Sequence, residues 1–131
     1  MDRWLVVLCG VLGFVGVALG AFGDHALEAV FAAAADGADR ARWWDTAVRY
    51  QMVHALALGL CAWLATQTQS KAPRVAGAAF ALGVLIFSGT LYAMALGAPR
   101  FLGAITPIGG VSLLVGWAAL VRAGLAAAPN P

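Results

Sequence analysis

The chain consists of long apolar runs that are separated by short clusters of charged residues. The charges bound four uncharged runs of 20, 21, 25 and 21 residues, between Arg3 and Asp24, Arg49 and Lys71, Arg74 and Arg100, and Arg100 and Arg122. A helix that crosses a membrane needs about 20 largely apolar residues, because the hydrocarbon core is ~30 Å thick. Buried strands need only about 4–8 residues, and residues 75–96 lack the alternation of a transmembrane barrel. The pattern predicts an all-α integral membrane bundle of four transmembrane helices, over about residues 4–22, 43–65, 75–96 and 101–121.

Residues 24–39 form the longest segment outside these runs. Acids stand near its start and apolar residues recur at helical spacing, at Asp24 and Glu28 and at Leu27, Val30, Phe31 and Ala34. This pattern predicts a short amphipathic helix that lies in the membrane interface. The next helix, from about residue 40 to 65, is long enough to begin among the headgroups, where Trp43 and Trp44 fit the aromatic belt. On its first turns, Asp45 and Arg49 have the spacing of an ion pair.

Glycine and proline mark expected contacts and bends in the predicted helices. Small residues allow helices in lipid to approach closely, and the candidates for this role are Gly13, Gly16, Gly20, Gly109 and Gly110. Packing within the chain is one interpretation, and contact within a homo-oligomer is the alternative. Pro107 falls inside the fourth predicted span, so we expect that helix to be bent or loosened there.

Composition restricts the class of protein. Hydrophobic residues make up 63% of the 131 residues and charged residues 11%, whereas soluble domains have roughly 25% charged residues. Lipid must solvate part of so apolar a chain, and we expect one transmembrane domain over residues 1–131. A net charge of +2 without a basic run argues against nucleic-acid binding. Cys9 and Cys61 form no CxxC pair, so neither a disulfide framework nor a zinc site is indicated. The first run is also compatible with a signal peptide.

The orientation in the membrane depends on the basic residues. Four spans place both termini and the turn at Lys71 on one face. Lysine and arginine number four on each face, so the positive-inside rule gives a tie. We favour a topology with both termini inside.

Polar side chains within the spans are expected to converge near one face. His54, Tyr92 and Thr106 lie five to eight residues from Arg49 or Arg100, which places them ~7–9 Å below the interface. Ser88 lies one turn deeper than Tyr92, and Tyr50 one turn shallower than His54. His25 follows the first helix at the same face. We predict a polar cluster that His54 organises.

An ionisable group in a membrane is a functional candidate, and three interpretations of His54 remain open. The three are a hydrogen-bonded link between helices, part of a ligand-binding site, and a ligand of a metal or haem. Haem needs two histidines that face each other, and His25 lies at the membrane edge while His54 lies deeper. No nucleophile–base pair, paired carboxylate or metal motif is present. We therefore expect no enzymatic activity, no cofactor and no metal.

Four ordered motifs give the chain a family resemblance. They are GAFGDHAL (residues 20–27), WDTAVRYQMVHALAL (44–58), FSGTLY (87–92) and LGAITPIGG (102–110), followed by Gly116-Trp117. The chain resembles a family of small membrane proteins labelled domain of unknown function 423 in bacteria, with eukaryotic relatives called transmembrane protein 256. Asp24 and Thr90 depart from its pattern, which has a small residue and a serine there. The resemblance implies a four-helix protein of the bacterial inner membrane and no established reaction.

Three functions are compatible with these features. The first is a non-enzymatic accessory or scaffold subunit that packs against other membrane proteins through its glycine-rich faces. The second is a binding module for a quinone or lipid, with a pocket lined by Trp43, Trp44, Tyr50, His54 and Tyr92. The third is a small transporter, which the lack of charged residues within the spans disfavours.

Overall fold

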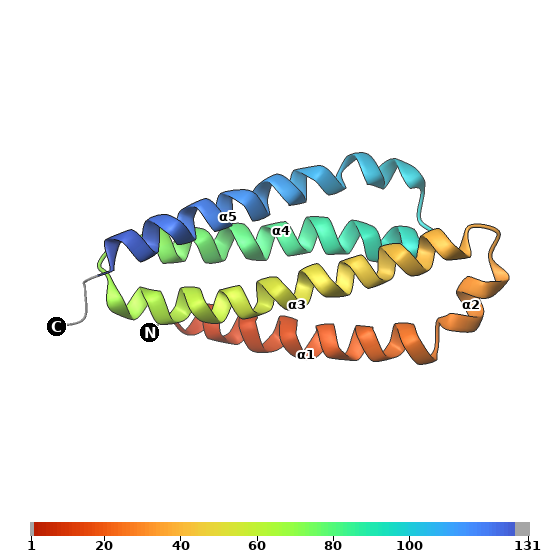
Figure 1. Ribbon diagram of the computed structural model, residues 1–131, viewed down its shortest axis with the longest axis horizontal. Helices are drawn as coiled ribbons and strands as arrows, with labels where there is room; N and C mark the ends of the chain where they lie inside the picture. Colours follow the sequence, from red (N-terminus) through yellow and green to blue (C-terminus); the bar gives the residue numbers. More distant parts are fainter. Residues whose placement is uncertain (1, 128–131) are drawn as a thin grey trace.

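The computed structural model describes residues 2–127 and is almost entirely helical, which confirms the all-α prediction. In chain order the elements are α1 (Arg3–His25), α2 (Glu28–Ala33), α3 (Gly37–Gln67), α4 (Ala72–Ala95), the short 3-10 helix η1 (Arg100–Ala104) and α5 (Thr106–Ala126). The short α2 lies beyond the end of α1 and the start of α3, at the far end of the molecule from the start of α1 and the end of α5 (Figure 1).

The four long helices lie side by side in the order α1, α3, α4, α5 (Figure 1). Each contacts its neighbour in this order along much of its length, whereas α1 and α5 do not touch within residues 2–127. The helices α1 and α4 both pack against α3 and run in the same direction. They meet where Leu5 packs against Gly77 and Asp2 pairs with Arg74, 2.9 Å apart. Beyond that point a groove separates them.

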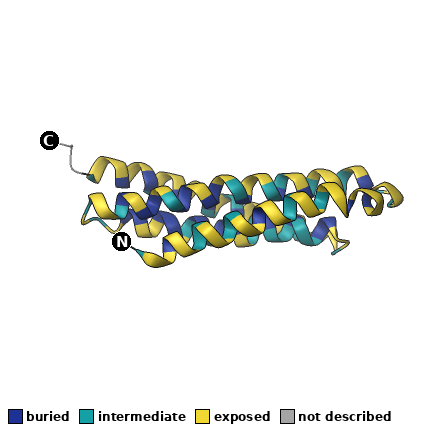
Figure 2. Cartoon of the chain, turned by 90° about the horizontal axis from the view of Figure 1, so that it is seen from below, coloured by how far each residue is buried: buried dark blue, intermediate teal, exposed yellow. Residues whose placement is uncertain are grey.

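Within residues 2–127, three segments are long and apolar enough to cross a membrane by length and composition: α1, α4 and the stretch Arg100–Ala126. The longest helix, α3, has 31 residues and measures about 46 Å, but it is less apolar. Its first turns carry Asp39, Arg40 and Arg42, and its middle carries Gln51 and His54. Figure 2 shows exposed positions along the outer faces of all four long helices, with the buried positions in narrower stripes between them.

Glycine sets the distance between α4 and α5. A β-carbon at Gly109 would overlap the backbone nitrogen of Phe87, and one at Gly116 would lie 2.5 Å from the ring of Phe80. Gly16 similarly faces the sulfur of Met52 across the α1–α3 contact. Of the other glycines expected at contacts, Gly20 and Gly110 would place a β-carbon at ordinary van der Waals distance from Val48 and Phe87. A β-carbon at Gly13 would meet no atom within 4 Å, so Gly13 is not at a close contact between helices.

The start of the last helix differs from the sequence prediction. Residues 101–121 are divided between η1 and α5, and α5 begins at Thr106. Pro107 therefore occupies the first turn of α5, where its missing N–H has no intrahelical partner to lose, and it starts the helix rather than bending it. Gly97, with φ of +102°, makes the turn between α4 and η1.

Candidate functional site

His54 lies in the middle of α3 and is 4% exposed. Its Nδ1 is 2.7 Å from the carbonyl oxygen of Tyr50, and the indole N–H of Trp117 on α5 donates to its Nε2 at 3.1 Å. An indole nitrogen can only donate, so Nε2 accepts and Nδ1 carries the proton that it donates to Tyr50. Both ring nitrogens of His54 are therefore engaged, and the imidazole is neutral.

Aromatic rings from three helices surround this imidazole. The ring centroids of Phe80 on α4 and Trp117 on α5 lie 5.3 and 5.7 Å from that of His54. Phe80 and Trp117 also meet edge to face, 5.1 Å apart. The ring of Tyr50 stacks on His54 at 6.0 Å. Because α3 and α5 otherwise make few contacts, the Trp117–His54 hydrogen bond is their main polar link.

A second set of hydrogen bonds joins α1, α3 and α4. The hydroxyl of Tyr92 donates to Oε1 of Gln51, and Nε2 of Gln51 donates to the carbonyl of Leu12, both at 2.8 Å. Gln51 is only 3% exposed. Nearby, the indole N–H of Trp44 donates to the carbonyl of Leu19 at 2.9 Å. Trp44 is therefore buried between α1 and α3.

Hydroxyl groups make further links between helices. Ser88 donates to the carbonyl of Ala47 at 2.8 Å and joins α4 to α3. On the other side of α4, the hydroxyls of Thr90 and Thr106 are 2.7 Å apart, and Ser112 donates to a carbonyl of α4 at 2.8 Å. Within residues 2–127, no buried side-chain nitrogen or oxygen lacks a hydrogen-bond partner.

The structure divides the predicted polar cluster among separate partners. The predicted contact between Tyr50 and His54 is present, but in the described part of the chain no hydrogen bond joins His54 to Tyr92 or Thr106. His25 lies exposed at the end of α1, away from His54.

The reason is that Arg49 and Arg100 do not mark the same depth. Arg100 pairs with Asp36 and Asp39, and Asp39 precedes Arg49 by 10 residues, or about 15 Å of helix. Distances counted inward from the two arginines therefore start at different levels. As a result, His54 lies farther from the η1 end of the molecule than Thr106 and Tyr92 do.

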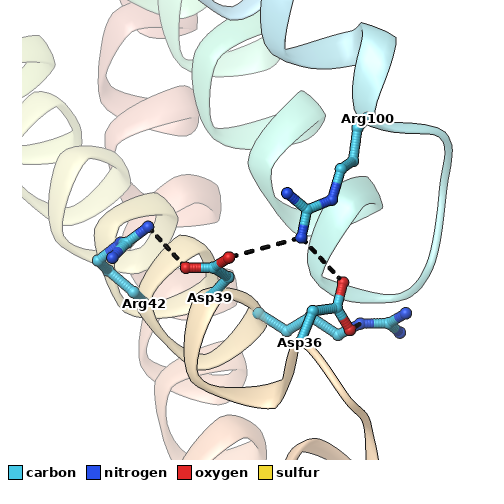
Figure 3. Close-up of polar contacts among 5 residues, drawn as sticks. Asp36, Asp39, Arg42 and Arg100 are labelled. Atoms are coloured by element: carbon cyan, nitrogen blue, oxygen red, sulfur yellow. Dashed lines mark hydrogen bonds and ion pairs between the residues drawn. The ribbon is translucent and has the colours of Figure 1, made fainter.

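An ion-pair network, which we call the loop clasp, joins the start of α3 to η1 (Figure 3). Nη2 of Arg100 lies 3.3 Å from Asp36 and 3.5 Å from Asp39. Asp39 also pairs with Arg42 at 2.9 Å, and Asp36 with Arg40 at 2.7 Å. The guanidinium of Arg100 further lies over the ring of Trp43, 5.1 Å from its centroid. The predicted pair between Asp45 and Arg49 is present as well.

The loop clasp changes the pKa of Asp36. The hydrogen bond from Arg40 lowers the pKa of this carboxyl below its ordinary value of 3.8. Partial burial opposes this change, and the hydrogen bond from Arg100 adds to it. Asp36 therefore favours its charged form through partners on both α3 and η1.

Two hollows flank α1. A cavity of about 740 Å³ lies between the end of α1, α2 and the first turns of α3, and its lining includes Trp44 and the acids Asp24, Glu28 and Asp45. The α1–α4 groove, of about 580 Å³, is apolar except at Gln51, Ser88 and Tyr92. Asp24 and Glu28 are exposed at the rim of the first cavity. In the described residues, histidine, cysteine, aspartate and glutamate form no group of three that could hold a metal ion.

Sequence reasoning missed several of the residues that make these contacts. Gln51, Trp117, Thr90 and Ser112 were not candidates, although each is a hydrogen-bonding side chain in an apolar run. Gln51, Thr90 and Trp117 all belong to the motifs that carry the family resemblance. Membership of a motif was therefore the signal that could have identified three of the four.

The fold and these contacts define a small helical membrane protein whose internal polar groups connect its helices. Residues 19–110 match the family described as "Protein of unknown function (DUF423)", and the chain belongs to this family. No solved structure of another protein matches the chain significantly.

Similar proteins occur in distantly related bacteria. The chain is 39% identical over 120 residues to a UPF0382 membrane protein of Haemophilus influenzae, covering 92% of each chain. It is 40% identical over 122 residues to the UPF0382 inner membrane protein YgdD of Escherichia coli K12, covering 92% of this chain and 88% of that one. A UPF0382 membrane protein of Staphylococcus epidermidis is 40% identical over 121 residues, covering 92% and 93%.

Proposed function

We propose that the protein crosses the cytoplasmic membrane four times, with α3 as the fourth span and α2 in the interface. Charged and polar residues make α3 less apolar than the other long helices, but Gln51 and His54 are buried against neighbouring helices and do not face lipid. A helix between α1 and α4 therefore needs an apolar surface only on its outer side. The similarity to an inner membrane protein of Escherichia coli supports this location.

Within that membrane, the proposed function is that of a non-enzymatic accessory subunit. The observation that carries this proposal is that the buried polar side chains are already used within the chain. Both nitrogens of His54, both ends of the Gln51 amide and the hydroxyls of Ser88 and Tyr92 have partners on the helices. Polar groups engaged in this way hold helices together and leave little for chemistry on a substrate.

An accessory subunit needs a surface for its partner, and the α1–α4 groove is the best candidate. Over most of its length α1 contacts only α3, so its side towards α4 is unpartnered. The groove runs from Leu8 to Leu19 on α1 and from Ala81 to Tyr92 on α4. A transmembrane helix of another subunit would complete the packing of both helices there.

One observation favours a second function, the binding of a lipophilic molecule such as a quinone or lipid. The α1–α4 groove has an apolar lining with polar side chains only at Gln51, Ser88 and Tyr92. This distribution suits a molecule with a long apolar tail and a small polar head. The groove differs from the pocket expected from the sequence, because Trp43, Tyr50 and His54 are not among its lining residues.

Photo-crosslinking distinguishes the two functions. A photoreactive residue at Leu85, which lines the groove on α4 and is 72% exposed, should crosslink one protein in stoichiometric amount if the accessory role holds. The matched control is Leu114 on α5, which is 68% exposed and lies outside the groove. Crosslinking to a lipid or quinone at Leu85 alone would favour the binding module. Equal crosslinking at both positions would contradict a specific role for the groove.

A further inference from the structure

A third cavity lies at the opposite end of the molecule from the loop clasp. It measures about 270 Å³ and is lined by Ser70, Lys71, Ala72, Val75, Ala119 and Arg122. The turn between α3 and α4 thus lies next to the last turns of α5, as the left end of Figure 1 shows. Lys71 and Arg122 are far apart in sequence, and the packing of α5 on α4 brings them to one cavity.

The charges of this cavity have no counterpart in the described part of the chain. Residues 2–127 contain no ion pair that involves Lys71 or Arg122. The acid at this end of the molecule, Asp2, is paired with Arg74 at 2.9 Å. At the other end, by contrast, Arg40, Arg42, Arg49 and Arg100 are all paired with acids of the chain. The cavity therefore concentrates two positive charges that no acid of residues 2–127 pairs with.

The other lining groups suit a phosphate ester with an attached apolar chain. The hydroxyl oxygen of Ser70 accepts a hydrogen bond from the N–H of Ala72 at 3.1 Å, which leaves its O–H to donate outward. The cavity also borders the N-terminal end of α4, where the helix dipole is positive. Val75 on α4 and Ala119 on α5 form an apolar wall of the cavity, and Val115, one turn before Ala119 on α5, is an exposed apolar residue.

We propose that this cavity binds the phosphate group of an anionic membrane lipid. Lys71 and Arg122 pair with the phosphate oxygens, the Ser70 hydroxyl donates to one of them, and an acyl chain follows Val75 and Ala119 along the α4–α5 surface. Basic pockets between transmembrane helices bind anionic headgroups in this way, and the guanidinium fork of arginine matches phosphate geometry. The apolar wall assigns the phosphate to a lipid rather than to a soluble anion.

Native mass spectrometry of the full chain tests this proposal. The protein is released from nanodiscs of phosphatidylcholine that contain a minority of phosphatidylglycerol, and the retained lipids are identified. The wild-type protein should retain phosphatidylglycerol above its share of the bilayer. Each cation contributes to headgroup binding, so the double variant K71Q/R122Q should lower the retention by about thirty-fold, and either single variant by about five-fold.

A matched double variant controls for net charge. R42Q/R49Q also removes two positive charges, but from the other end of the molecule, and it should retain phosphatidylglycerol like the wild type. The charge-conserving variant K71R/R122K should do the same. If K71Q/R122Q and R42Q/R49Q lost phosphatidylglycerol retention equally, the proposal would be overturned. The same holds if the wild-type protein showed no enrichment of phosphatidylglycerol. Titration of detergent-solubilised protein with inorganic phosphate should show no binding that depends on Lys71 and Arg122, and such binding would overturn the assignment to a lipid.

Discussion

His54 illustrates how a polar side chain in an apolar run can be structural. As an ionisable group in a predicted span, it was a candidate for a link between helices, for ligand binding or for metal ligation, and in the structure both ring nitrogens have partners within the chain. The Trp117 indole supplies a donor from a helix 63 residues away in sequence. A hydrogen bond of this kind between transmembrane helices contributes about 0.6–1.7 kcal/mol, enough to align helices but not to dominate folding.

Replacement of His54 by leucine should therefore weaken the fold modestly. The variant leaves the Trp117 N–H without an acceptor, and we expect the free energy of unfolding in mixed micelles to fall by about 1–2 kcal/mol. Val53→Leu, at a position of the same helix that is 47% exposed, is the control and should change little. In the double variant with Trp117→Phe the losses should be less than additive, because both changes remove one hydrogen bond. Fully additive losses would contradict the Trp117–His54 link.

Contacts between whole helices depend on which side of a helix each glycine faces. A methyl group at Gly109 would overlap the Phe87 backbone, which cannot move without displacing α4. At Gly13 the same methyl group would meet no atom within 4 Å. Residue type alone assigned both residues to helix packing, and only the packed helices distinguish them.

We expect Gly109→Ala to lower the free energy of unfolding by about 1–3 kcal/mol, since it forces α4 and α5 apart. Gly13→Ala should leave stability unchanged or raise it by up to about 1 kcal/mol, because alanine favours helix more than glycine does. Reversible unfolding in mixed micelles measures both. A larger loss for Gly13→Ala than for Gly109→Ala would show that α1 makes contacts that this arrangement does not contain.

The loop clasp connects η1 to the beginning of α3. Arg100→Gln should accelerate hydrogen exchange at the amides of η1, such as Leu102, by roughly two- to five-fold, as for loss of an exposed ion pair. Arg49→Gln is the control, because the pair of Arg49 with Asp45 lies within α3. Unchanged exchange in Arg100→Gln would indicate that packing, rather than charge, holds η1.

The same clasp should respond to acid with a defined sign. Its partners lower the pKa of Asp36 in the folded protein. The ion pairs of Asp36 therefore stabilise the clasp fully when the pH is above the ordinary pKa of 3.8, and this stabilisation is lost as the pH falls through the lower, folded-state pKa. The difference in exchange between the wild-type protein and Arg100→Gln should therefore be constant above about pH 4 and shrink below it. A difference that instead disappeared near pH 6 would point to a group other than Asp36.

For the molecule as a whole, the proposed four spans imply a definite labelling pattern. Single cysteines at positions 36, 70 and 100 are introduced after Cys9 and Cys61 have been replaced by alanine. Ser70 should react with a membrane-impermeant reagent from one side, and Asp36 and Arg100 from the other. The clasp between Asp36 and Arg100 already requires these two residues to share a side. Labelling of Asp36 and Ser70 from the same side would rule out α3 as a span, and labelling of Ser70 and Arg100 from the same side would rule out α4.

The amino-acid sequence was sufficient for the features that depend on distance along the chain. The spacing of charged residues predicted the long helices, since helix length follows directly from residue number, and the resemblance of four motifs predicted the family. Short-range contacts such as Asp45–Arg49 and Tyr50–His54 were also predictable, because residues four apart share a helix face.

The tertiary structure alone decided the contacts between helices. Counting from Arg49 and Arg100 measured position within each helix, but it could not show how far one helix is shifted along its neighbour. That shift pairs His54 with Trp117 and Tyr92 with Gln51, and it leaves Gly13 outside the contacts that Gly16 makes. Rotation and sliding of a helix depend on the simultaneous packing of all its neighbours, and no single run of residues encodes them.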